Sequence, residues 1–252
     1  MPHFYVILFT LLFLLVLFVA ISAKERQILI DIGANCGDSY TKLLKAYPQY
    51  AESANAEIFL FEANPIISRH FLPKLSSKDP RVKVYPYAVS ANSTTSTMIF
   101  TIYYGKSMEH YKDQEIQQMT CHENSILTGS LDDGDYRHGG RFYNVTEGGE
   151  TKLRKRKSKN VVVKVVNLKE WLRDLNLDKS DSVILKMDVE GSEFGILQDL
   201  MTDQDLFCLV DMWHVEFHLI ETEMLSAEDK MLIRKSFLDK VRACGTLYGY
   251  WD

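Results

Sequence analysis

The chain has 252 residues and a formal net charge of −5, with 46% hydrophobic and 25% charged residues. These values are typical of a globular protein with a sizeable core, and the acidic balance argues against nucleic acid as the main partner. One domain of ordinary size is therefore expected after the N-terminal segment, and no feature of the sequence sets an oligomeric state.

An uncharged apolar stretch covers residues 4–21. Its 18 residues are at the lower end of a membrane-spanning length and are long for the core of a signal peptide. Small residues at Ala20 and Ser22 resemble a cleavage site. Residues 1–23 are therefore expected to be a hydrophobic helix that acts as a signal peptide or as an uncleaved signal anchor. This segment predicts localisation to a membrane or to the secretory pathway, with the membrane as a partner.

The topology of that segment has two interpretations. Lys24 and Arg26 follow the apolar stretch, which favours a cytoplasmic domain. Asn92 and Asn144 each begin an N-glycosylation sequon, which favours a lumenal domain. Both interpretations stay open.

The first strand is predicted at residues 28–32, a short apolar run rich in β-branched side chains. Gly33, Asn35 and Gly37 then occupy every second position of the following turn. An amphipathic helix pattern covers residues 39–47. A strand, a glycine-rich turn and a helix N-terminus together form a cradle for a nucleotide-like cofactor. Asp31 adds a carboxylate, which suits a cationic or amino-bearing ligand better than a pyrophosphate.

A second strand-like run covers residues 57–62 and ends on Glu62. An acid at the end of the second strand of a βαβ unit can accept hydrogen bonds from two ribose hydroxyls. A dinucleotide dehydrogenase is the natural alternative, but Asn35 and Asp38 stand where its fingerprint requires glycine. The glycine pattern therefore argues against an NAD site.

A third group of polar residues follows two later apolar runs. Asp188 and Glu190 come directly after the buried strand predicted at residues 183–187. Glu216 and His218 lie at the end of the run at residues 207–216. Open α/β sheets bind ligands at the carboxyl ends of their strands, so these side chains are candidates for proton transfer or metal coordination.

The remaining patterns complete an α/β order. They predict helices at 66–75, 168–175, 192–202 and 226–243, strands at 82–88, 96–104, 161–166 and near 246–250, and an irregular insert around 105–160. Alternating strands and helices imply a mainly parallel twisted sheet with helices on both faces. Residues 99–103 and 161–166 are candidates for an added hairpin.

The four cysteines are too sparse for a disulfide framework in a domain of this size. Cys36 falls in the predicted cofactor loop and Cys208 in a predicted strand, so both are expected to be unpaired. Ordinary packing is expected for all four, with a bridge left open for Cys121. No zinc-site motif occurs.

Four blocks together resemble the FkbM-type family of S-adenosylmethionine-dependent methyltransferases. They occupy residues 31–37, 61–65, 186–193 and 215–218, in the order of the family. The resemblance covers nearly all of the chain after Lys24. It implies a Rossmann-like domain over residues 24–252, S-adenosylmethionine as methyl donor, and O-methylation of a hydroxyl on a sugar or other small-molecule acceptor. The insert lies where acceptor recognition would vary.

Roles follow from this placement. On the cofactor side, the methionine end is assigned to Asp31, Gly33, Asn35 and Gly37, and the ribose to Glu62. On the acceptor side, the catalytic candidates are Asp188, Glu190, Glu216 and His218, whereas His214 is expected to serve packing. Oxygen-rich ligands would suit magnesium, but the sequence does not require a divalent cation and no metal ligand is assigned.

Two other classes of function remain as alternatives. A membrane-tethered, non-catalytic Rossmann-like binding module would keep the fold and lose its motifs, whereas the cofactor motifs here are intact. An NAD or nucleotide-sugar enzyme would keep the nucleotide-binding unit but needs a different glycine pattern. The sequence therefore favours an enzyme, and specifically a methyltransferase acting on a glycan or small molecule.

Overall fold

The computed structural model describes residues 26–91, 96–104, 128–130, 142–147, 150–155, 157–218 and 225–251. The hydrophobic helix expected within residues 1–23 lies outside these ranges. Among the described residues, no helix is both long and apolar enough to cross a membrane.

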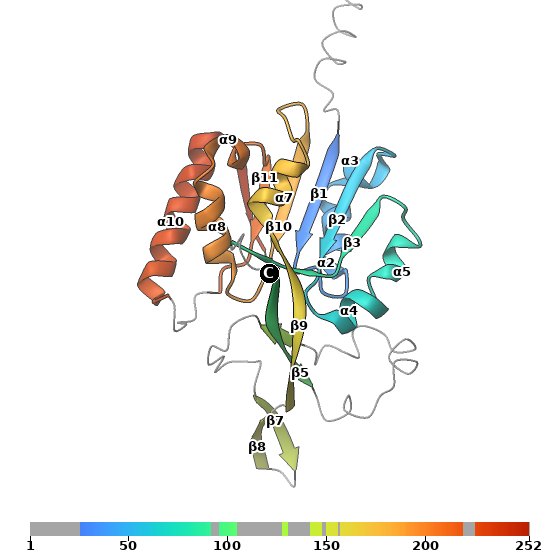
Figure 1. Cartoon of the computed structure of the whole chain (residues 1–252), viewed down its shortest axis with the longest axis vertical. Coiled ribbons are helices and arrows are strands. Elements are labelled where there is room, and N and C mark those ends of the chain that lie inside the picture. The colour runs from blue at the N-terminus through green and yellow to red at the C-terminus, as the bar shows by residue number, and fades with distance from the viewer. Residues whose placement is uncertain are drawn as a thin grey trace, which may run out of the picture.

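A six-stranded parallel sheet forms the centre of the fold (Figure 1). Its strands, in spatial order, are β12 (Leu247–Tyr250), β11 (Met212–Val215), β10 (Ser182–Met187), β1 (Gln27–Ile32), β2 (Ala56–Phe61) and β3 (Val82–Tyr85). Every neighbouring pair is parallel, which confirms the mainly parallel sheet. The central strands are short apolar runs because both of their faces are covered.

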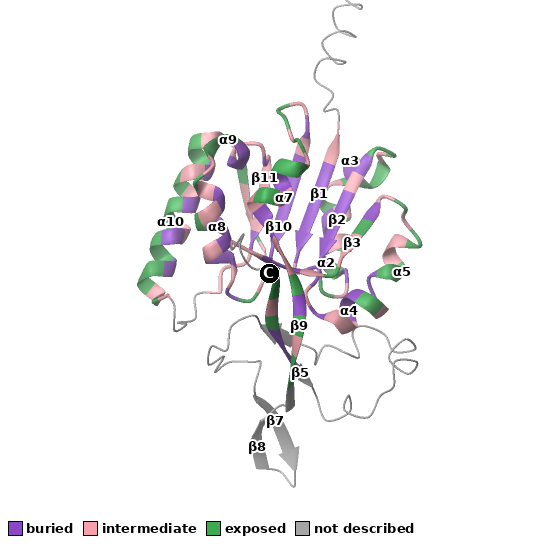
Figure 2. Ribbon diagram, in the orientation of Figure 1, coloured by how far each residue is buried: buried purple, intermediate pink, exposed green. Residues whose placement is uncertain are grey.

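Helices cover the two faces of this sheet. One face packs against α7 (Leu168–Asp174), α8 (Glu193–Met201), α9 (Gln204–Phe207) and α10 (Ala227–Cys244). The other packs against α2 (Asp38–Ala46), α3 (Pro48–Glu52), α4 (Pro65–His70) and α5 (Pro73–Ser76). Alternate residues of β1 serve the two cores, with Ile28, Ile30 and Ile32 on the first face and Leu29 on the second. Figure 2 shows the buried residues concentrated in the central strands.

A second sheet follows β3 in the chain. Its order is β4 (Tyr87–Ser90), β9 (Lys157–Asn167), β5 (Thr97–Tyr104) and β6 (Thr128–Ser130). β5 and β9 pair antiparallel, with Ile99 opposite Val162, which confirms the added hairpin. The insert expected to be irregular contains β6, the beginning of β9 and a two-stranded sheet of β7 (Phe142–Glu147) and β8 (Glu150–Lys155). That expectation was wrong for these segments.

Three other expectations are corrected. Pro86 separates β3 from β4, because proline lacks the N–H that a continuous strand needs, so residues 82–88 are not one strand. Residues 66–75 form two short helices, and Pro73 begins the second. The run at 207–216 is a strand only over Met212–Val215, because Asp203 accepts a hydrogen bond from Leu206 N at 3.1 Å and starts α9 instead.

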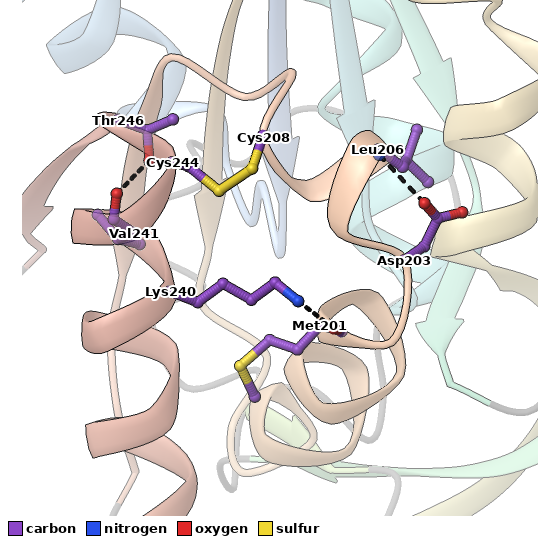
Figure 3. The surroundings of a disulfide bond; sticks show 8 residues. All are labelled: Met201, Asp203, Leu206, Cys208, Lys240, Val241, Cys244 and Thr246. Carbon is purple, nitrogen blue, oxygen red and sulfur yellow. Dashed lines mark hydrogen bonds between the residues drawn. A yellow bond between two sulfur atoms is a disulfide. The ribbon is translucent and has the colours of Figure 1, made fainter.

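A disulfide joins Cys208, just after α9, to Cys244, at the end of α10 (Figure 3). Its S–S distance is 2.02 Å and the two Cα atoms are 5.1 Å apart. Lys240 donates to the carbonyl of Met201 beside it and ties α10 to the end of α8. The expectation of an unpaired Cys208 was wrong, because Cys208 lies in the turn after α9 and not in a strand. Cys36 is also disulfide-bonded, so its expected unpaired state was wrong as well.

Candidate active site

The strand register gathers the predicted site residues on one face of the main sheet. Asp31 is paired with Lys186 across β1 and β10, and Lys186 with His214 across β10 and β11. The backbone ladder continues one residue further, because Asp188 N donates to Ile32 O and Glu216 N donates to Met187 O, both at 3.0 Å. Since side chains alternate with a period of two, Asp188 and Glu216 follow Lys186 and His214 on the same face. Acids that lie far apart in sequence thus meet at the carboxyl edge.

Asp31 is fully buried, and its contacts lie within the protein. Ser39 Oγ, at the start of α2, donates to Asp31 Oδ2. Lys186 Nζ lies 3.2 Å from Asp31 Oδ1. The carboxylate therefore fastens the first turn of α2 and the β10 strand to the end of β1. Its predicted contact with the methionine end of a cofactor stays a prediction.

The loop after β1 has the left-handed backbone that its sequence suggests. Gly33 has φ 79°, Asn35 φ 46° and Gly37 φ 85°. A Cβ on Gly33 would lie 1.8 Å from the carbonyl oxygen of Asp188, and one on Gly37 would lie 2.3 Å from Leu75 Cδ1. Gly33 is therefore required for close approach within the protein, whereas at Gly37 the positive φ is the stronger reason for glycine, because the Leu75 side chain can move.

Glu62 lies directly after β2, and its carboxylate spans two loops. One oxygen accepts a hydrogen bond from Asn35 N at 2.8 Å and the other from Asn64 N at 2.7 Å. Burial raises the pKa of Glu62 to about 7, against the lowering effect of the two backbone N–H donors and of the Lys186 charge. Each carboxylate oxygen has a second lone pair available to a hydroxyl donor. This geometry fits the ribose-binding role predicted for Glu62.

His218 lies among carboxylates at the ends of β10 and β11. Its Nε2 lies 3.6 Å from Glu190 Oε2, 3.6 Å from Glu216 Oε1 and 4.0 Å from Asp188 Oδ1. Burial alone would lower the pKa of His218, but Glu193 and the neighbouring acids outweigh it and raise the pKa to about 9. The four predicted catalytic residues are thus brought together.

Residues 31–245 match the family described as the methyltransferase FkbM domain. This span is most of the chain. The chain belongs to the FkbM methyltransferase family. Comparison with curated proteins and with solved structures found no significant match.

Family membership makes this chain a methyltransferase with S-adenosylmethionine as its methyl donor. The residues of the FkbM domain fit that donor. The loop at Gly33 and the Glu62 carboxylate lie beside each other, because Gly33 N and Ala34 N both donate to Phe61 O, next to Glu62. The first two strands therefore present a backbone turn and a buried carboxylate at one place.

Two residues of the FkbM domain have a larger part in the site than the sequence suggested. Lys186 is 1% exposed and contacts Asp31, Asp188 and the Gly33 carbonyl. Glu193 falls at the start of the helix predicted at 192–202. It is fully buried, and its Oε1 accepts from His218 N at 2.6 Å and lies 3.3 Å from His218 Nδ1. Its place in the 186–193 block was the available signal.

His214 serves packing, as expected. Its Nε2 lies 2.7 Å from the hydroxyl of Tyr47, and its ring makes an edge contact with Trp251. Burial lowers the pKa of His214, so its imidazole is neutral at physiological pH. His214 therefore packs on β11, on the same face of the sheet as Lys186.

Proposed function

We propose that this methyltransferase transfers a methyl group to a hydroxyl oxygen of a sugar or other small-molecule acceptor. The observation that carries the proposal is the position of the acidic cluster, beside the cofactor loop. Asp188 Oδ2 lies 3.5 Å from Lys186 Nζ, and the same Nζ donates to the Gly33 carbonyl at 2.8 Å. A hydroxyl held at the cluster would therefore lie next to the donor.

The chemistry of a hydroxyl acceptor suits these side chains. S-adenosylmethionine supplies an activated methyl group when it is bound. The protein must then align the acceptor oxygen and take up the proton that the oxygen loses. Asp188, Glu190 and Glu216 offer carboxylate oxygens for that proton, and Lys186 holds Asp188 in place. The involvement of a divalent cation stays a prediction.

We infer that the domain works in the secretory pathway, on a glycan or small molecule there, with the membrane as a partner through residues 4–21. The Cys208–Cys244 disulfide supports this inference, because disulfides persist in oxidising compartments and are rare in the cytosol. Carbonate extraction distinguishes an uncleaved anchor from a cleaved signal peptide. A glycosidase-sensitive mass shift that is lost in Asn92→Gln or Asn144→Gln would demonstrate a lumenal domain.

The decisive experiment supplies the full chain with isotopically labelled S-adenosylmethionine and a mixture of glycans and small molecules. Mass spectrometry then locates the label. We expect an O-methyl product, and we expect Asp188→Asn to abolish it while the affinity for S-adenosylhomocysteine stays within about tenfold, or roughly 1.4 kcal/mol. Asp239→Asn, an exposed substitution on α10, is the matched control and should retain full activity.

A label on nitrogen, carbon or sulfur would contradict the proposal, as would normal turnover by Asp188→Asn. Binding of S-adenosylhomocysteine without any labelled product from membranes or secretory extracts would favour the non-catalytic binding module. Binding of NAD or a nucleotide sugar in its place would favour the other alternative.

A further inference from the structure

Three side chains from two neighbouring loops direct ligand atoms toward one point. Asp188 and Glu190 follow β10, and His218 follows β11. One ligand atom from each lies within 4.8 Å of the other two. Among them, His218 Nε2 is 3.6 Å from Glu190 Oε2 and 4.0 Å from Asp188 Oδ1, which is too long for a hydrogen bond. Metal–ligand bonds of about 2.1 Å place two ligand atoms roughly 3–4 Å apart, so the spacing matches donors around a shared ion.

A second observation comes from α8, outside this group of donors. Glu193 is fully buried, and its Oε1 lies 3.3 Å from His218 Nδ1. The same Oε1 accepts a hydrogen bond from His218 N at 2.6 Å, and Oε2 accepts one from Gly191 N at 2.8 Å. These two bonds fix the orientation of the carboxylate. The Nδ1 atom of His218 therefore faces Glu193, and its Nε2 atom faces the carboxylates of Asp188 and Glu190. Histidines that bind metals are oriented in this way, by a carboxylate on the other ring nitrogen.

The charges around the point also favour a cation. Glu216 Oε1 is 3.6 Å from the same Nε2, so carboxylates from Asp188, Glu190, Glu193 and Glu216 surround one imidazole. Lys186 lies on the Oδ2 side of Asp188, and the Oδ1 side faces His218. A group with more negative than positive charges attracts a divalent cation strongly where burial reduces screening by water.

We propose that Asp188, Glu190 and His218 Nε2 bind a divalent metal ion, with Glu193 as a positioning residue for His218. One imidazole nitrogen among carboxylate oxygens favours Mn²⁺ over Ca²⁺ or Mg²⁺, which prefer ligand sets made only of oxygen. The sequence made these side chains candidates for metal coordination without assigning a ligand, and it considered magnesium as the ion. The ion would hold an acceptor hydroxyl next to the methyl donor, and this role, unlike the binding itself, rests on the proposed function.

The test measures Mn²⁺ binding to the chelator-treated full chain, without donor or acceptor. Electron paramagnetic resonance of free Mn²⁺ gives the affinity, and its pulsed form detects coupling to a ligand nitrogen. We expect one Mn²⁺ per chain with nitrogen coupling. Glu190→Gln, a half-exposed position, should weaken binding at least tenfold, and His218→Asn should remove the nitrogen coupling. Asp239→Asn is the control and should change neither.

Glu193→Gln tests the positioning role. We expect weaker Mn²⁺ binding and an altered nitrogen coupling, whereas a residue important only for folding would lower the melting temperature and leave the coupling of the bound ion unchanged. A dissociation constant above about 1 mM for the parent protein would overturn the proposal. Equal binding by the parent protein and by Glu190→Gln would also overturn it. The experiment measures Mn²⁺ binding and not methyl transfer. Its result therefore tests the metal site even if the proposed function is wrong.

Discussion

Lys186 Nζ lies 2.8 Å from the carbonyl oxygen of Gly33, so a buried side chain of β10 fastens the loop after β1. The same ammonium group faces Asp31 and Asp188. Burial works to lower the pKa of Lys186, but these two carboxylates outweigh it and hold the pKa above its usual value, so the lysine is charged at neutral pH. One charge thus connects the loop after β1 to the acidic cluster after β10.

Lys186→Met should destabilise the protein by roughly 3–5 kcal/mol, because it leaves the buried Asp31 carboxylate without its counter-ion. Denaturant unfolding measures the loss. Lys83→Met is the matched control, since it removes a lysine that pairs with Glu57 at 2.6 Å on the surface, where such pairs contribute at most about 1 kcal/mol. Equal losses in the two variants would show that Lys186 is not an essential partner of Asp31.

Gly33→Ala should be severely destabilising. The new Cβ would lie 1.8 Å from the Asp188 carbonyl oxygen, and the positive φ adds strain of about 1–3 kcal/mol. Gly195→Ala is the opposite case, because Gly195 lies inside α8 and a Cβ there would have no neighbouring atom within 4 Å. It should be neutral or stabilising by up to about 1 kcal/mol, since alanine favours a helix interior. Thermal melting of the two variants side by side checks the contrast.

Loss of the Cys208–Cys244 disulfide should lower the free energy of unfolding by about 3–4 kcal/mol, the chain-entropy value for a separation of 36 residues. The double variant Cys208→Ser/Cys244→Ser isolates this bond, whereas a reductant would also reach the disulfide of Cys36. Thiol labelling of the unfolded, unreduced parent protein gives an independent check, and labelled Cys208 or Cys244 would contradict the bond.

Much of the sheet could be predicted because its strands are continuous apolar runs, as at Ile28, Ile30 and Ile32, followed by glycine or acid. The hydrophobic pattern gave wrong element boundaries where one polar residue or one proline determines where a helix or strand begins or ends. Asp203 caps a short helix inside an apolar run, and Pro86 divides a strand between two sheets. Cys244 shows a different limit, because its partner is brought close only by the packing of α10.

The site shows the same division. Acids at strand ends could be found from the sequence, because parallel strands deliver their carboxyl ends to one edge. The 186–193 block marked Glu193, but its contact with His218 could not be predicted, because that contact depends on how the beginning of α8 lies beside the end of β11. Nor could the sequence tell that Asp31 contacts Ser39 and Lys186.

Affinity for S-adenosylhomocysteine should rise with pH through about 7. In the predicted ribose-binding role, hydroxyls would donate to the ionised form of Glu62, and burial raises the pKa of this group to about 7. Isothermal titration at several pH values measures the effect, and Glu62→Gln should flatten it. A pH dependence that persists unchanged in Glu62→Gln would show that Glu62 is not its source.

The same raised pKa predicts the stability of the ligand-free protein. Between the ordinary value of 4.5 and about 7, the folded state keeps a proton on Glu62 that the unfolded state has lost. The contribution of Glu62 to stability therefore declines as the pH rises across this interval. Denaturant unfolding of the parent protein and of Glu62→Gln across the interval should reveal the difference.

Ligand-dependent melting of the full chain is the sharpest test of whether the β1 loop and Glu62 bind the methyl donor. S-adenosylhomocysteine, NAD and a nucleotide sugar are compared in parallel. Only S-adenosylhomocysteine should raise the melting temperature, since ligand at a hundred times its dissociation constant stabilises by about 2.7 kcal/mol. Glu62→Ala should reduce that shift without unfolding the protein. An unchanged melting curve at saturating S-adenosylhomocysteine would contradict the account.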